Sequence, residues 1–249
     1  MTSGMALGKL PSSPISHEAG DEDERLSRSG SSTRLIGLAG LATFTLIVIA
    51  ALVSPPLWDA PGTNSTGSAV AAFTLHGATR ITASLFVYSL AMGLFLCFIA
   101  GLWSWFRERD AGSHALSSIF GLSGVALVVL ILAGLVPMYL LGYRHEPSSI
   151  AGLLADLTFG LLALSGIPTA VCLATYAGLV IRDGGLPRWT ACIAVISAIA
   201  HVLIAASFLS HGELLSLESE VIVWVPATFF IWILASGAML FWRHPGITN

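Results

Sequence analysis

Ionisable side chains inside or beside long apolar stretches are the first candidates for chemistry in this sequence. His201 and Asp156 each lie within such a stretch, and His76 and Arg80 lie at the entrance to another. A titratable or charged group is costly in a bilayer, so these positions are functional candidates by default. We predict that Asp156, Arg80 and His201 form a polar cluster that opens to the outer face.

The members of this cluster have different expected roles. Asp156 and Arg80 can form a structural ion pair, and His201 can relay a proton or bind a ligand because histidine titrates near neutral pH. The alternative is that Asp156 lies at the membrane interface and that His201 is a hydrogen-bonded packing residue. Only the first interpretation brings these side chains into one cavity.

A second candidate for chemistry is Ser123, which lies in the segment Gly-Leu-Ser-Gly at residues 121–124. This GxSG form resembles the motif of rhomboid intramembrane proteases, in which a serine and a histidine form a catalytic dyad. The resemblance would pair Ser123 with His201. However, the spans that carry these two residues run in the opposite direction to those of the family. An intramembrane serine protease is therefore a lesser alternative.

The other histidines and the cysteines form no metal-binding pattern. His76 and His211 could approach each other at the outer surface as axial haem ligands, which makes a haem protein another lesser alternative. Cys97, Cys172 and Cys192 lie in separate apolar stretches, where a free cysteine is typically a small buried side chain. We therefore expect no metal and no cofactor.

The composition excludes a soluble globular protein. The chain has 249 residues, of which 55% are hydrophobic and 10% are charged, whereas soluble domains carry about 25% charged residues. The mean hydropathy is +0.84. The formal net charge of −3 is small and dispersed, which argues against nucleic acid as a partner. The expected partner is the lipid bilayer.

Six apolar stretches are each long enough to cross a bilayer as an α-helix, which needs about 20 residues for about 30 Å. The apolarity is continuous and does not alternate, so helices are expected and not a β-barrel. The predicted fold is an all-α bundle of six transmembrane helices over residues 35–243, between a disordered tail at residues 1–34 and a short tail at residues 244–249. The predicted spans are residues 35–55, 81–106, 115–141, 152–181, 189–209 and 221–242.

The basic residues predict the orientation of the bundle. With the N-terminus in the cytoplasm, only Arg80 and Arg144 fall on the outer side. The inner side then holds nine basic residues: Lys9, Arg25, Arg28, Arg34, Arg107, Arg109, Arg182, Arg188 and Arg243. Cytoplasmic loops carry the excess of Lys and Arg, so we predict that both termini are cytoplasmic. Ten Arg against one Lys, with abundant Ala and Gly, indicates a bacterium of high GC content, so we expect the bacterial cytoplasmic membrane.

Small residues predict where helices approach each other closely. The fourth span carries Gly166, Ala170, Ala174 and Gly178 at intervals of four residues, so they share one helix face. Such a face suits a central, tightly packed helix, and where it is exposed it permits a homo-oligomer or a membrane protein partner. Pro168 in the same span predicts a kink because it removes one backbone donor.

Spans two and six end alike. The segments 101–107 and 237–243 each begin with Gly and end with Arg, and aromatic residues precede the Arg in both. Two explanations stay open at this point. One is an ancient duplication of helix pairs, and the other is the ordinary design of an inner helix end.

The layout resembles uncharacterised bacterial six-span membrane proteins of the DUF4386 type. The resemblance is carried by the polar tail, the inner Arg clusters and the segment Gly-Gly-Leu-Pro-Arg-Trp at residues 184–189. It implies no established activity and no catalytic residues. We expect a non-enzymatic scaffold or regulatory partner, with a small transporter or permease as the alternative. Spans one and three carry no charge, which favours the scaffold because a transport path needs polar groups on several helices.

Overall fold

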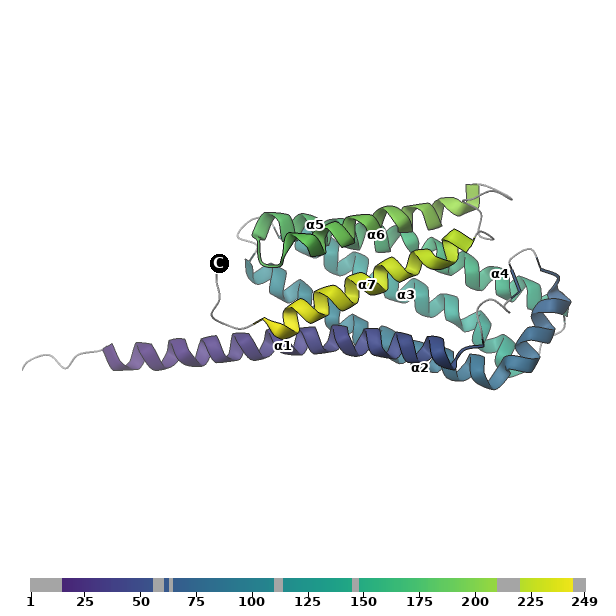
Figure 1. The fold of residues 1–249 in the computed structure, drawn as a ribbon, viewed down its shortest axis with the longest axis horizontal. Helices are drawn as coiled ribbons and strands as arrows, with labels where there is room; N and C mark the ends of the chain where they lie inside the picture. Colours follow the sequence, from purple (N-terminus) through teal and green to yellow (C-terminus); the bar gives the residue numbers. More distant parts are fainter. Residues whose placement is uncertain are drawn as a thin grey trace, which may run out of the picture.

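The computed structural model describes residues 15–55, 61–62, 65–109, 114–144, 148–209 and 220–243, and within these it is helical with no strand. Side chains are described for these residues except at 15–31 and 220–223. The elements, shown in Figure 1, are α1 (Ile15–Val53), α2 (Gly67–Arg109), α3 (Ala115–Arg144), α4 (Ser148–Leu164), α5 (Gly166–Asp183), α6 (Arg188–Ala206), a short 3₁₀ turn η2 (Ser207–Leu209) and α7 (Glu220–Trp242).

Six segments of these helices are long and apolar enough to cross a membrane, so the predicted all-α, six-span fold is confirmed. This is the architecture of a multi-pass membrane protein. The segments are Ser32–Val53, Gly67–Arg109, Ala115–Arg144, Ser148–Asp183, Arg188–Leu209 and Trp224–Trp242.

Two helices begin earlier than the apolar stretches predict. α1 begins at Ile15 and therefore includes residues 15–34, which we expected in the N-terminal tail; residues 1–14 lie outside the described residues. α2 begins at Gly67 and is 43 residues long, although the predicted span starts at residue 81. Hydropathy marks where a helix enters hydrocarbon and not where its hydrogen bonds begin, so the sequence places both starts too late.

The helices follow one another around a closed ring. Packing runs from α1 to α2, α3, α5, α6 and α7 in turn, and α7 packs back against α1. α4 packs against α2 and α3 at the end of the bundle where α2 begins (Figure 1). Sequential helices lie side by side, as short connections between antiparallel helices require.

Aromatic side chains fill the centre of this ring. In this aromatic column, the ring centroid of Tyr176 lies 5.1 Å from that of Trp232 and 5.8 Å from that of Phe106. The rings meet mostly edge to face, the arrangement that aromatic pairs favour. The members of the aromatic column, all 3% exposed or less, are Phe95, Phe98, Phe106, Phe120, Tyr176, Phe229 and Trp232. The centre is therefore a packed core.

Glycines hold α1 against α7. A Cβ on Gly37 would lie 2.4 Å from the backbone nitrogen of Phe241, which is closer than real Cβ contacts come. A Cβ on Gly40 would lie 3.1 Å from the Cα of Gly237. The two backbones are thus in direct contact, the packing that small residues permit between transmembrane helices. We call Gly37, Gly40 and Gly237 the glycine seat.

The repeated helix ends of spans two and six both face α1. A Cβ on Gly101 would lie 2.5 Å from Cγ1 of Ile36, and a Cβ on Gly237 would lie 3.1 Å from the backbone nitrogen of Leu41. Each Gly therefore lies where its helix packs against α1. This shared contact gives a packing reason for the similarity of the two segments, which neither the duplication nor the design of an inner helix end includes.

The fourth span is interrupted close to its proline. α4 ends at Leu164, α5 begins at Gly166, and Ser165 between them forms a turn. Pro168 has no N–H to donate to the carbonyl of Leu164. The hydroxyl of Ser165 donates to the carbonyl of Leu162 at 2.6 Å. The span thus consists of two helices, with the break one turn ahead of the proline.

Candidate polar site

Arg80 and His76 each bond to a backbone carbonyl near the start of α2. The Nε and Nη2 atoms of Arg80 donate to the carbonyls of Val53 and Ser54 at 3.0 and 2.7 Å. These are orphan carbonyls at the end of α1, and a basic side chain there is a typical C-terminal cap. Nδ1 of His76 lies 2.7 Å from the carbonyl of Ala72, one turn back in its own helix. Both side chains are exposed.

Asp156 lies apart from Arg80 and His201. Its side chain is exposed on α4, and among the residues that the structure describes no ion pair joins it to Arg80. Arg80 is instead used in capping α1. Among the described residues, no hydrogen bond or ion pair joins Asp156, Arg80 and His201 to one another.

His201 is buried between α6 and α7. Its ring is 6% exposed and lies 5.7 Å from the ring of Phe229, centroid to centroid. Nδ1 lies 2.8 Å from the carbonyl oxygen of Ser197, which can only accept, so Nδ1 carries the proton. The Nε2 lone pair is then the free acceptor of the neutral ring. His201 packs as the hydrogen-bonded interpretation describes.

Two hydroxyls accompany His201. The Thr228 hydroxyl, on α7, lies 3.0 Å from Oγ of Ser197, and that oxygen lies 3.4 Å from Nδ1 of His201. The Thr228 hydroxyl also donates to the carbonyl of Val225 at 2.7 Å. We call Ser197, His201 and Thr228 the outer polar trio. It ties α6 to α7 and was not expected, because a lone Thr in an apolar span gives no signal of its partner.

The small residues of the fourth span divide into two pairs. Gly166 makes a close contact, since a Cβ there would lie 2.4 Å from the carbonyl oxygen of His201 on α6, and Ala170 is buried. Ala174 is exposed, and a Cβ on Gly178 would have nothing within 4 Å. The face is therefore used within the bundle at its Gly166 end and left uncovered at its Gly178 end.

The protease alternative finds no matching geometry in the part of the chain that the structure describes. The hydroxyl of Ser123 donates to the carbonyls of Ile119 and Phe120, at 2.7 and 3.1 Å, and no hydrogen bond joins it to His201. His211 lies outside the described residues, so its pairing with His76 is a prediction. Over the described residues, no group of three or more His, Cys, Asp or Glu could hold a metal ion.

A second buried polar group was missed at the inner half of the bundle. The Tyr176 hydroxyl donates to Oγ1 of Thr190 at 3.1 Å and lies 2.9 Å from Oγ of Ser236. All three residues are fully buried, and they join α5, α6 and α7. We call them the inner polar trio. The only signal in the sequence is a tyrosine in the middle of an apolar span, where a buried hydroxyl needs a partner.

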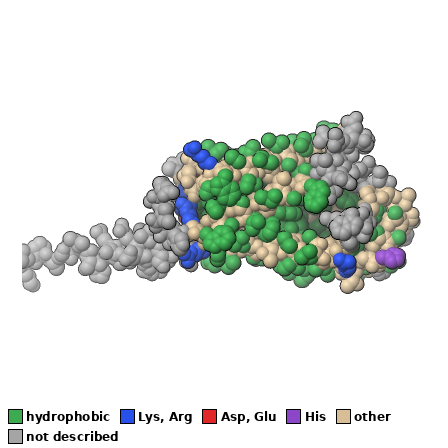
Figure 2. Space-filling model, in the orientation of Figure 1, with side chains coloured by type: hydrophobic (Ala, Val, Ile, Leu, Met, Phe, Trp, Pro, Cys, Tyr) green, Lys and Arg blue, Asp and Glu red, His purple; other side chains and the backbone are tan. Residues whose placement is uncertain are grey.

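The end of the bundle where α2 ends carries most of the described arginines (Figure 2). The guanidinium of Arg109 lies 4.0 Å from the centroid of the Trp105 ring, and that of Arg243 lies 5.6 Å from it. Arg243 also donates to the carbonyl of Gly185, whose backbone passes directly against Trp105. Cation–π contacts of this kind hold both arginines against the Trp105 ring.

Comparisons of the chain with protein-family models, with curated proteins and with solved structures found no match. The resemblance to membrane proteins of the DUF4386 type therefore stays a prediction from the sequence.

Proposed function

We propose that this chain is a non-enzymatic scaffold or regulatory partner in a bacterial cytoplasmic membrane, with both termini in the cytoplasm. It acts through contacts between its own transmembrane helices and those of a second protein or a second copy. The observation that carries the proposal is the uncovered small-residue face of α5, formed by Ala174 and Gly178. A face of this kind lets a neighbouring helix approach closely.

The orientation rests on the arginines at the two ends of the bundle. One end has Arg80 and Arg144. The other end has Arg34, Arg107, Arg109, Arg182, Arg188 and Arg243. The positive-inside rule assigns the second end to the cytoplasm. A fluorescent-protein fusion at the C-terminus should therefore be bright and an alkaline phosphatase fusion there inactive. The reverse pattern would contradict the orientation.

The core supports a scaffold over a transport path. The aromatic column fills the centre of the ring, and the polar side chains Arg80, Asp156 and His201 lie on separate surfaces or interfaces. Transport sites in helical bundles gather polar groups from several helices around a cavity. A packed aromatic centre is suited to rigid support of lateral contacts.

Site-specific photo-crosslinking in native membranes tests the scaffold. Benzoylphenylalanine replaces Ala174 on the proposed contact face, and in a control it replaces Val129, which is 58% exposed on α3. We expect a discrete adduct from position 174 and none from position 129. An adduct of twice the monomer mass would identify a second copy of the chain. No adduct from position 174, or the same adducts from both positions, would contradict the proposal.

The outer polar trio favours one second candidate, a small transporter with an outer-half site. His201 is titratable, buried and bonded on one nitrogen only, and such groups act in proton relays. Purified protein in liposomes would be tested with a pH-sensitive dye under an imposed potential. The transporter predicts a proton flux above that of empty liposomes that is lost in His201→Gln, whereas the scaffold predicts no such flux.

A further inference from the structure

A polar pocket opens between α1 and α2 at the inner end of the bundle. Its volume is about 510 Å³, and its lining includes Ser32, Ile36, Ala100, Trp105 and Glu108. Ser32 lies two residues before Arg34, and Glu108 lies between Arg107 and Arg109 in the last turn of α2. The pocket therefore lies where two helices leave the hydrocarbon, at the depth of lipid headgroups. Ser32 and Glu108 are exposed, so the pocket opens to the surroundings.

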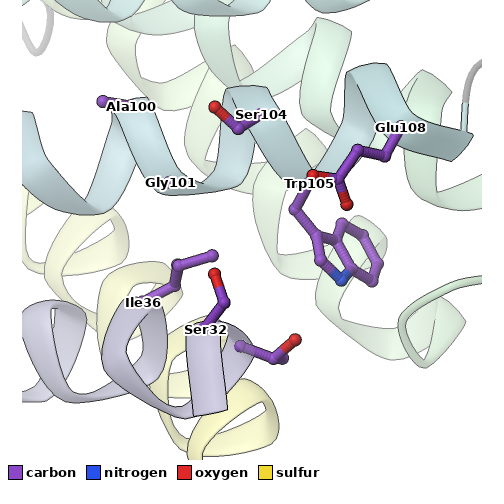
Figure 3. A pocket seen from close by; sticks show the side chains of 8 residues that line it. Ser32, Ile36, Ala100, Gly101, Ser104, Trp105 and Glu108 are labelled. Atoms are coloured by element: carbon purple, nitrogen blue, oxygen red, sulfur yellow. The ribbon is translucent and has the colours of Figure 1, made fainter. Parts of the chain in front are cut away.

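The pocket holds an unused hydrogen-bond donor. Trp105 is 4% exposed, and its indole nitrogen Nε1 has no hydrogen-bond partner among the described residues. A buried tryptophan N–H normally finds an acceptor. Figure 3 shows the Trp105 indole and the Glu108 carboxylate extending from α2 toward α1, while the hydroxyl of Ser32 points from α1 toward α2.

One acidic side chain, Glu108, lines the pocket, and it interacts electrostatically with Arg109. Among the described residues Glu108 forms no ion pair. Its two neighbours in sequence are arginines, but their guanidinium groups lie against indole rings: Arg109 is 4.0 Å from the Trp105 centroid and Arg107 is 6.0 Å from the Trp103 centroid. Glu108 thus lines the pocket as an acceptor for a cation, at an end of the bundle where the other described acid, Asp183, is already paired with Arg182.

We propose that this pocket binds the headgroup of an aminophospholipid of the phosphatidylethanolamine class. The primary ammonium donates to the Glu108 carboxylate, and a phosphate oxygen accepts from the Trp105 indole N–H and the Ser32 hydroxyl. Charge-assisted hydrogen bonds of this kind are the strong ones. Ile36 and Ala100 give the pocket an apolar wall for the glycerol end of the lipid. The proposal needs the chain to span a bilayer, and it holds whether or not the chain acts as a scaffold.

The pocket chemistry discriminates between lipid classes. Phosphatidylglycerol has the same phosphate and no cation, so its headgroup leaves Glu108 unpaired beside a negative charge. Phosphatidylcholine keeps the positive charge but has no N–H to donate. An ethanolamine headgroup supplies both the charge and the donors. The expected order of affinity is therefore ethanolamine, then choline, then glycerol.

Native mass spectrometry of the full-length detergent-solubilised protein tests the proposal, with the three lipids carrying identical acyl chains. We expect the wild type to retain phosphatidylethanolamine about 1.5- to fivefold more than phosphatidylglycerol, the effect of one exposed charge pair. Glu108→Gln should abolish this preference, and Asp156→Asn, an exposed carboxylate on α4 at the other end of the bundle, should leave it unchanged. Trp105→Phe should weaken retention of all three lipids, because it removes the donor to their shared phosphate.

Several outcomes would overturn the proposal. One is equal or preferred retention of phosphatidylglycerol by the wild type. Another is that Glu108→Gln still prefers phosphatidylethanolamine over phosphatidylglycerol. Because Glu108 is exposed, we expect this variant to fold, and its elution as a monodisperse species checks the folding. A third is competition by soluble glycerophosphoethanolamine as strong as that by the intact lipid, because it would show that the pocket binds the free headgroup and not a membrane lipid.

Discussion

Two helices of this protein carry small residues on one face, and only one of these faces is fully covered. On α1, a Cβ at Gly37 would lie 2.4 Å from the backbone of α7, whereas on α5 a Cβ at Gly178 would have no atom within 4 Å. The α1 face has two glycines three residues apart, and the α5 face has glycine and alanine at intervals of four residues. The difference shows that a small-residue face allows a neighbouring helix to approach closely. Whether that neighbouring helix belongs to the same chain depends on the topology of the bundle.

The largest expected effect is that of Gly37→Ala, which tests whether the glycine seat holds α1. The added Cβ would meet backbone atoms of Phe241, which cannot rotate away as a side chain could. We expect a loss of about 1–3 kcal/mol in unfolding free energy, measured by denaturant titration in detergent micelles. Gly93→Ala on α2, where a Cβ meets nothing within 4 Å, is the matched control. Equal stability of the two variants would contradict the close contact.

An intermediate effect is expected for Tyr176→Phe, which tests the buried face of α5. The change keeps the ring of the aromatic column and removes the hydroxyl that bonds to Thr190 and Ser236. We expect a loss of about 0.6–1.7 kcal/mol, the range for hydrogen bonds between transmembrane helices. A double-mutant cycle with Ser236→Ala measures the coupling. Additive losses would show that the two hydroxyls do not depend on each other.

The smallest effect, and one of opposite sign, is expected for Gly178→Ala. The added methyl group has open space, and alanine favours a helix over glycine by about 1 kcal/mol. The isolated protein in micelles should therefore gain up to about 1 kcal/mol. If α5 is the contact face, the same substitution should weaken the photo-crosslinked adduct at position 174 in membranes. Destabilisation in micelles would mean that an intramolecular neighbour already covers Gly178.

The number of membrane-spanning helices could be predicted from the sequence because few backbone structures satisfy their own hydrogen bonds in hydrocarbon. Peptide groups without water must bond within the segment, so six continuous apolar stretches give six helices. Pro168 cannot donate to the carbonyl of Leu164, but the turn in this span falls at Ser165, so the kink at Pro168 stays a prediction. The start of α2 could not be predicted from hydropathy, since a helix continues beyond the hydrocarbon wherever its residues tolerate it.

The contacts between helices could be predicted much less well. The recurrence of Gly101 and Gly237 was visible, but nothing in either segment indicates that both receive α1. Arg80 and Asp156 were expected to pair because each is costly alone, and the structure satisfies Arg80 with the orphan carbonyls of α1 instead. The end of every helix has backbone carbonyls without an intrahelical partner. Such carbonyls compete with acidic side chains for the N–H groups of a nearby arginine, and the sequence does not show which acceptor lies closer.

The closure of the ring through the glycine seat has a consequence for how the chain is made. Synthesis proceeds from the N-terminus, so α1 and its exposed glycine face enter the membrane well before α7 exists. Until the ribosome has delivered the last span, only the α2 side of α1 has its helical neighbour. Premature termination would thus leave a membrane-inserted fragment in which Gly37 and Gly40 lack the α7 backbone that packs against them.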